Sequence, residues 1–208
     1  MNKIKGNKEI LNLTLTAIFI AIILVFNFTF LGFIKVGVIE ISLIGIPVSV
    51  GAVLLGKRSG VILGTTFGVL SFAQCFGMSA FGTALMAINP VYTFIMCLVP
   101  RVLMGGLSAW IFQLLQKTKL PQTLSSTIAC VACALTNTIG FIGLFIAFFS
   151  QTEFFTNLQS EMGVSNLFAF IVAFVGINGL VEVLANAVVG AAMSPVIQRL
   201  NKQMKSVK

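Results

Sequence analysis

The sequence contains no histidine and no aspartate. Their absence excludes the Ser-His-Asp triad, histidine-zinc sites and the paired aspartates of intramembrane proteases. There is also no GxxxxGK[ST] phosphate-binding loop, so the chain lacks the usual means of hydrolysing ATP. The four cysteines all fall in apolar segments and are expected to act as small packing residues. We therefore expect no enzyme activity, no metal and no cofactor, and any uphill transport must draw its energy from a partner.

Charged residues are scarce: they make up 9% of the chain, while 58% of the residues are hydrophobic. The mean hydropathy of +1.06 lies well outside the range of soluble globular proteins. A soluble fold of this size cannot cover so much apolar surface, so the lipid bilayer must serve as its solvent. The net charge of +8 does not indicate a nucleic-acid partner, because the basic residues lie at the chain ends and in short loops.

Apolar runs separated by short links predict an all-α integral membrane bundle of six transmembrane helices. The predicted spans are residues 11–33, 42–56, 60–77, 90–115, 124–150 and 166–193. The second and third are near the lower length limit for crossing a hydrocarbon core of about 30 Å. No linker or change of composition divides the chain, so residues 1–208 are expected to form a single domain.

The loop charges predict the orientation of this bundle. One side carries nearly all of the basic residues: Lys3, Lys5, Lys8, Lys57, Arg58, Lys117, Lys119, Arg199, Lys202, Lys205 and Lys208. The other side carries Lys35 with Glu40, and Glu153 with Glu161. By the positive-inside rule, both termini are expected to be cytoplasmic.

Small residues recur at four-residue spacing on three of the predicted helices. The first span carries Ala17 and Ala21, and the second and third carry a stripe that includes Gly60, Gly64 and Gly68. Residues four apart share one helix face, and small residues allow helices to pack closely in lipid. Internal packing is the simpler interpretation of these faces, and an outward docking face at Ala17 and Ala21 is the alternative.

Only two charged residues fall within the predicted spans, Arg101 in the fourth and Glu182 in the sixth. A charge in the bilayer is costly unless it is paired or solvated, which leaves two interpretations. The two residues form a buried salt bridge that fixes helix register, or they line a cavity in which Arg101 binds the carboxylate of a small solute. Pro100 should bend the span beside Arg101 and free a carbonyl near Met96, which favours the cavity.

Amide side chains accompany both charges. Asn178 lies one turn from Glu182, and Asn137 lies near the middle of the fifth span. Asn89 directly precedes Pro90, so it is also a good N-cap for the fourth span.

Five stretches carry a family resemblance: residues 45–56 (GIPVSVGAVLLG), 63–71 (LGTTFGVLS), 99–105 (VPRVLMG), 135–139 (LTNTI) and 178–182 (NGLVE). With six short-looped spans and the Ala17-x-x-x-Ala21 pattern, the chain resembles the S components of energy-coupling factor (ECF) transporters, in particular their pantothenate-type branch. One difference is that this branch often has a histidine before the proline of the second helix, where this chain has Gly45-Ile46-Pro47.

The resemblance implies a high-affinity vitamin-binding subunit, a multi-pass protein of the bacterial cell membrane. It implies that the substrate binds on the extracellular side, under a mobile loop at about residues 37–44. It also implies ATP-driven import through a transmembrane coupling subunit and two cytosolic ATPase subunits, with Ala17 and Ala21 docking on the coupling subunit.

Pantothenate is the substrate that this resemblance favours. The expected site residues are Arg101 for the carboxylate, Asn137 and Asn178 for the amide and hydroxyls, Glu182 to orient Arg101, and Asn89 and Gln74 at the outer mouth. The alternatives are an S component for another small vitamin or precursor, and an autonomous channel or facilitator for small solutes. An intramembrane enzyme is a more remote alternative.

Overall fold

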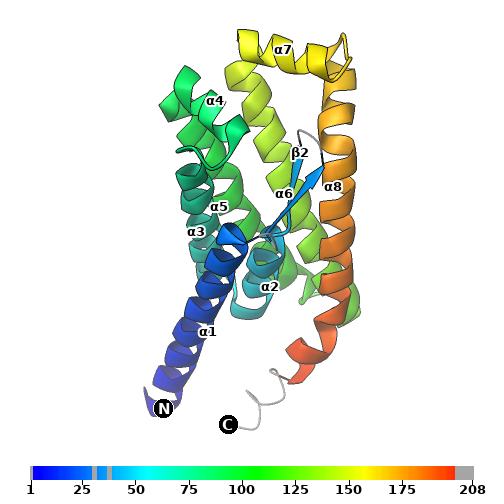
Figure 1. Ribbon diagram of the computed structural model, residues 1–208. Coiled ribbons are helices and arrows are strands. Elements are labelled where there is room, and N and C mark those ends of the chain that lie inside the picture. Colours follow the sequence, from blue (N-terminus) through cyan, green and yellow to red (C-terminus); the bar gives the residue numbers. More distant parts are fainter. Residues whose placement is uncertain (1, 30–31, 37–38, 200–208) are drawn as a thin grey trace.

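A computed structural model describes residues 2–29, 32–36 and 39–199. These residues form helices joined by short links, with one β-hairpin between the first two helices (Figure 1). The elements are α1 (Asn2–Phe28), β1 (Phe33–Val36), β2 (Ile39–Ser42), α2 (Gly45–Leu55), α3 (Lys57–Gln74), α4 (Ala80–Ile88), α5 (Pro90–Leu115), α6 (Gln122–Phe149), α7 (Glu153–Glu161) and α8 (Leu167–Ala192).

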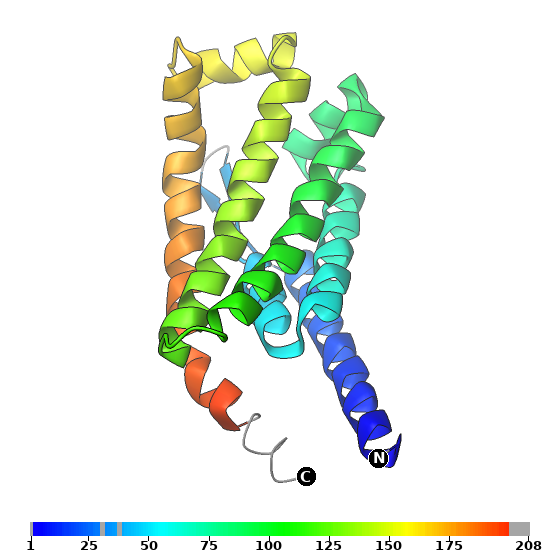
Figure 2. The same ribbon diagram turned by 180° about the vertical axis from the view of Figure 1, so that it is seen from behind.

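The long helices run side by side, and the two ends of the bundle differ. Helix α1 begins and helix α8 ends at one end, where the α2–α3 and α5–α6 links also lie (Figures 1 and 2). The short helices α4 and α7 lie at the opposite end (Figure 1). Lys57 and Arg58 begin α3, and Lys117 and Lys119 lie in the α5–α6 link, so these basic residues gather at the end where α1 begins.

The predicted helical membrane fold is confirmed, with corrections to its details. Each predicted span contains one helix, but the first helix ends at Phe28, and Phe33, the predicted end of that span, begins β1. The hairpin and helices α4 and α7 were not predicted. Four segments are long and apolar enough to cross a membrane: Glu9–Phe28, Pro90–Leu115, Gln122–Phe149 and Gly179–Arg199. The six crossings and the side on which the termini lie stay predictions.

Side-chain caps determine where several helices begin. The Oδ1 atom of Asn89 accepts hydrogen bonds from the backbone N–H groups of Val91 and Tyr92, each at 3.1 Å, as predicted for an N-cap before Pro90. Thr152 caps α7 in the same way by accepting from the N–H of Phe155 at 3.3 Å. These caps satisfy N–H groups that the first turn of a helix leaves without partners.

The glycine stripe of α3 packs inside the bundle against α5. A Cβ atom added to Gly60 would lie 2.4 Å from the carbonyl oxygen of Gly105, and one added to Gly64 would lie 2.1 Å from that of Arg101. Both contacts are with backbone atoms, which cannot move aside as a side chain can. The prediction that this stripe packs internally is therefore confirmed, and the close approach fixes the position of Arg101 relative to α3.

Two apolar clusters lie at different levels of the bundle. The first, called here the floor cluster, contains Ile23, Ile44, Val48, Leu63, Phe67, Met104 and Cys133. The second, called the phenylalanine cluster, contains Leu85, Met96, Ile142, Phe145, Phe149, Phe155, Leu158 and Phe170, with Phe81, Phe141 and Phe174 packed against it. Because it includes residues of α4 and α7, the phenylalanine cluster lies toward the end that these two helices occupy.

The β-hairpin forms most of the connection between α1 and α2. Its strands are antiparallel, with Phe33 opposite Ser42 and Val36 opposite Ile39. The N–H of Leu43 donates to the carbonyl of Gly32 at 2.9 Å, which joins the two ends of the hairpin. Strand β2 contacts α8, and Figure 1 shows it between α6 and α8. The predicted mobile loop at residues 37–44 thus includes β2, while Gly37 and Val38 lie outside the described residues.

Candidate functional site

Arg101 is buried, with 8% of its surface exposed, and the proline before it in the chain determines one of its contacts. Pro100 has no N–H, so the carbonyl of Met96, four residues earlier, loses its helical partner. The Nη1 atom of Arg101 donates to that carbonyl at 2.9 Å, which confirms the predicted free carbonyl near Met96. The guanidinium carbon lies 5.5 Å from the ring centre of Phe67 and 4.8 Å from that of Phe141. The cation is therefore within cation–π distance of two aromatic rings.

Glu182 is similarly buried, at 7% exposure, and its hydrogen-bond partner comes from α6. Its Oε2 atom accepts from the hydroxyl of Thr138 at 3.2 Å. The backbone of Ser42 and the side chain of Asn137 also approach this carboxylate. Arg101 is near enough to Glu182 to attract it, but no ion pair joins the two among the side chains that the structure describes. The two charges thus share one polar region without a direct salt bridge.

Several buried polar atoms in this region have no hydrogen-bond partner among the described residues. They are Nδ2 and Oδ1 of Asn27, Oγ of Ser42, Nε of Arg101 and Oδ1 of Asn137. Leaving such an atom unpaired costs about 1–3 kcal/mol, so native proteins contain few of them. These four residues come from α1, β2, α5 and α6. A further unpaired atom, Nε2 of Gln122, lies apart from them at the start of α6.

The four residues lie on the same side of the floor cluster. Helices α1 and α6 run away from the end where α1 begins, and α5 runs toward it (Figure 1). A later residue on α1 or α6 and an earlier residue on α5 are therefore displaced in the same direction. Each of the four lies farther from the end where α1 begins than a nearby member of the floor cluster. The separation is about one helical turn for Asn27 from Ile23, Arg101 from Met104 and Asn137 from Cys133, and two positions for Ser42 from Ile44. These four residues therefore lie at similar levels between the floor cluster and the phenylalanine cluster, and we call them the polar layer.

The structure brings together three of the residues predicted for the site: Arg101, Asn137 and Glu182. Gln74 lies beside the layer, where its Nε2 atom donates to the backbone carbonyl of Asn27 at 3.2 Å. Asn89 uses its Oδ1 atom to cap α5. Asn178 lies on α8 one turn before Glu182, and its side chain lies outside the described part of the structure. The binding roles of all six residues stay predictions.

The residues that sequence reasoning missed are Asn27 and Ser42. Asn27 is the one amide side chain between residues 13 and 28, in an otherwise apolar run, and that isolation was the available signal. Ser42 was placed in the second span, whereas it ends β2.

Two thiols lie near enough to Arg101 to interact with its charge. The Sγ atoms of Cys75 and Cys97 are 3.8 Å apart, and both cysteines are buried and free. Over residues 2–29, 32–36 and 39–199, no three cysteine or glutamate side chains gather into a group that could hold a metal ion.

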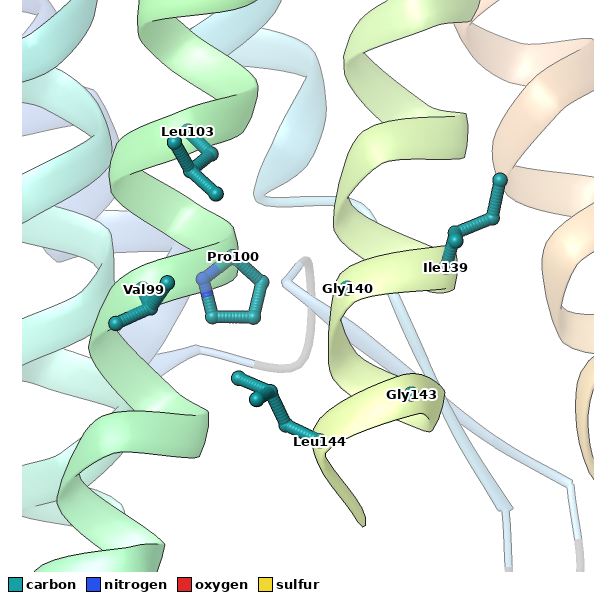
Figure 3. Close-up of a pocket in the computed structure, with 7 residues that line it drawn as sticks. All are labelled: Val99, Pro100, Leu103, Ile139, Gly140, Gly143 and Leu144. Atoms are coloured by element: carbon teal, nitrogen blue, oxygen red, sulfur yellow. The ribbon is translucent and has the colours of Figure 1, made fainter. Parts of the chain in front are cut away.

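A separate apolar groove of about 270 Å³ lies between α5 and α6. Its lining is Val99, Pro100, Leu103, Ile139, Gly140, Gly143 and Leu144 (Figure 3). Leu103 and Ile139 are among the exposed apolar residues, so the groove opens on the outer surface of the bundle. It contains no charged or amide side chain and is distinct from the polar layer.

The Ala17 and Ala21 pair lies on the outer surface of α1. The opposite face of α1 packs inward through Thr16, Ile23 and Asn27, which are buried. The hydroxyl of Thr16 donates to that of Ser59 at 2.9 Å, which joins α1 to α3. The exposed small residues therefore take no part in packing within the described chain, and this favours the outward alternative.

The fold and the polar layer define a helical membrane protein with buried polar groups, several of which have no hydrogen-bond partner among the described residues. The sequence profile of the family described as "ECF transporter, substrate-specific component" matches residues 11–193. The chain is also 29% identical over 200 residues to the "Pantothenate transporter PanT" of Leuconostoc mesenteroides subsp. mesenteroides, covering 92% of this chain and 94% of that protein. The chain belongs to the family of ECF transporter substrate-specific components, which is a family of transporter components and not of enzymes. The resemblance stated from the sequence is confirmed.

Proposed function

We propose that this chain is the high-affinity pantothenate-binding subunit of an ATP-driven ECF importer. The observation that carries the proposal is the polar layer, where the buried Arg101 and buried amide and hydroxyl groups at a similar level all have atoms without partners among the described residues. The similarity to a pantothenate transporter over most of the chain supports the choice of substrate.

Pantothenate has a terminal carboxylate, a central amide, two hydroxyls and a branched apolar carbon. Arg101 binds the carboxylate through the donors that Met96 does not use. Asn137 and Asn178 hydrogen-bond the amide and hydroxyls, and Glu182 orients Arg101 by electrostatic attraction. Asn89 and Gln74 line the outer mouth. The floor cluster and Phe141 offer apolar surface for the branched carbon.

We further propose six crossings in one domain over residues 1–208, with both termini in the cytoplasm of a bacterial cell. The gathering of basic links at the end where α1 begins supports this orientation. The polar layer then faces the extracellular half of the bundle, under the hairpin between α1 and α2. Closed and open hairpin positions are two states whose populations the substrate shifts.

The energy for import comes from partners in this proposal. The sequence has no phosphate-binding loop, so two cytosolic ATPase subunits hydrolyse ATP and a transmembrane coupling subunit transmits the change. The exposed Ala17 and Ala21 face of α1 docks on that coupling subunit, because small residues allow two helices to approach closely in lipid.

A thermal-shift screen of the purified chain tests the substrate assignment. A ligand at 1,000 times its Kd stabilises the folded state by about 4.1 kcal/mol. For a chain of this size, pantothenate should then raise the melting temperature by about 8–16 °C. A shift with a different vitamin and none with pantothenate would establish the alternative S-component assignment.

A further inference from the structure

We propose that Asn27 on α1 is a further substrate-contacting residue, which determines specificity by hydrogen-bonding the substrate's amide or a hydroxyl. The inference rests on the proposed function and adds a residue and a helix to its site. Asn27 is 3% exposed, and neither its Nδ2 nor its Oδ1 atom has a hydrogen-bond partner among the described residues. An asparagine side chain offers two donors and an acceptor, so its entire hydrogen-bonding capacity is unused.

The position of Asn27 is fixed although its side chain is unpaired. Ile23, one turn earlier, belongs to the floor cluster, and Phe67 of the same cluster lies 5.5 Å from the guanidinium carbon of Arg101. Gln74 donates to the backbone carbonyl of Asn27 and so joins the end of α1 to the end of α3. The backbone of Asn27 is thus held in place by its neighbours, so its side-chain amide is preorganised for binding.

Asn186 on α8 provides a comparison, because it is a buried asparagine whose side chain is hydrogen-bonded within the protein. It is also 3% exposed. Its Oδ1 atom accepts from the hydroxyl of Ser49 at 2.7 Å, and its Nδ2 atom donates to the carbonyl of Glu182 at 2.9 Å. The two asparagines are equally buried, but the side chain of Asn186 has hydrogen-bond partners and that of Asn27 has none among the described residues.

The unpaired atoms of the layer indicate which hydrogen-bonding groups a ligand would need in order to pair with them. The Oδ1 atoms of Asn27 and Asn137 each require an N–H or O–H donor from the ligand, and the Nδ2 atom of Asn27 requires an acceptor. Arg101 takes a carboxylate. A ligand that combines a carboxylate with an amide and hydroxyls meets all of these requirements, and pantothenate has this set of groups.

The test measures ligand-free stability and pantothenate affinity on the same purified full-length variants. Asn27→Leu is expected to melt at or above the wild-type temperature, because it removes an unpaired polar group from a buried site. The same variant, and Asn27→Ala beside it, should bind pantothenate about 30-fold or more weakly, because substrate groups are left without partners. The matched control Asn186→Leu should lower the melting temperature, because it breaks two hydrogen bonds.

Pantothenol, which keeps the amide and hydroxyls of pantothenate but replaces its carboxylate with an alcohol, separates Asn27 from Arg101. Both Asn27 variants should lose affinity for pantothenol by the same factor as for pantothenate. Unchanged pantothenate affinity in both variants overturns the inference and leaves the proposed function intact. A loss of ligand-free stability in both, equal to that of Asn186→Leu, also overturns it by showing a structural role. Failure of the wild-type chain to bind pantothenate overturns the proposed function and the inference with it.

Discussion

Replacing Arg101 with glutamine should weaken pantothenate binding by about 100-fold or more. The carboxylate enters a buried region in which Arg101 is the cation, close to the rings of Phe67 and Phe141. Removing one partner of a buried, hydrogen-bonded charge pair costs about 2–5 kcal/mol, and every 1.4 kcal/mol is tenfold in affinity. Calorimetric titration of the purified variant measures this loss directly.

Pantothenol shows whether the loss comes from the carboxylate. It has no negative charge for Arg101 to bind, so its affinity should change much less than that of pantothenate. Arg58→Gln, at an exposed arginine at the start of α3, serves as the control and should leave both affinities unchanged. Equal losses for pantothenate and pantothenol in Arg101→Gln would mean that the arginine only supports the fold, through the Met96 carbonyl and the two rings.

Replacing Ala17 and Ala21 together with tryptophan should abolish ATP-driven uptake and leave pantothenate affinity unchanged. Both alanines are exposed on the face of α1 that points away from the polar layer, so bulky side chains there meet no part of the described chain. The same side chains would hold the coupling subunit away from α1, because close helix approach in lipid requires small residues. Uptake in proteoliposomes with the full transporter, beside titration of the isolated chain, gives the two readouts.

The exposed residues Leu184 and Val188 of α8 provide a matched control for this pair. They have the same four-residue spacing on an outward face. Leu184→Trp with Val188→Trp should retain both binding and uptake. If the Ala17 and Ala21 variant binds pantothenate poorly, the face contributes to the subunit itself, and if it transports normally, α1 docks elsewhere.

The long helices could be predicted from the sequence because their apolar runs and caps are explicit. Asn89 followed by Pro90 specified the start of α5, and the structure shows the expected cap. The predicted spans left residues 34–41 between the first two helices, but the sequence did not show that these residues form a hairpin. Phe33 and Ser42, at the ends of its two strands, were assigned to the neighbouring helices. Short apolar runs are ambiguous between helix and strand, because neither periodicity repeats enough to be distinguished.

The candidate site was predictable where charge made a residue conspicuous. Arg101 and Glu182 stood out because charges in a bilayer are costly, and the structure places them in one polar region. Their hydrogen-bond partners, the Met96 carbonyl and the Thr138 hydroxyl, depend on side-chain rotamers that spacing does not specify. Asn27 was missed for a related reason. A single amide in an apolar helix can be satisfied by any neighbouring helix, and only the structure shows that its atoms have no partner among the described residues.

The central claim is that this chain binds pantothenate but needs partners to transport it. The most direct test measures uptake of radiolabelled pantothenate into proteoliposomes that contain either the wild-type chain alone or the chain assembled with its coupling subunit and ATPases. A substrate-binding subunit without ATPase machinery should bind pantothenate but transport none of it alone. Concentrative uptake should appear only with the complete assembly and internal ATP. Uptake by the chain alone, dissipating a pantothenate gradient without ATP, would contradict this account and identify an autonomous channel or facilitator.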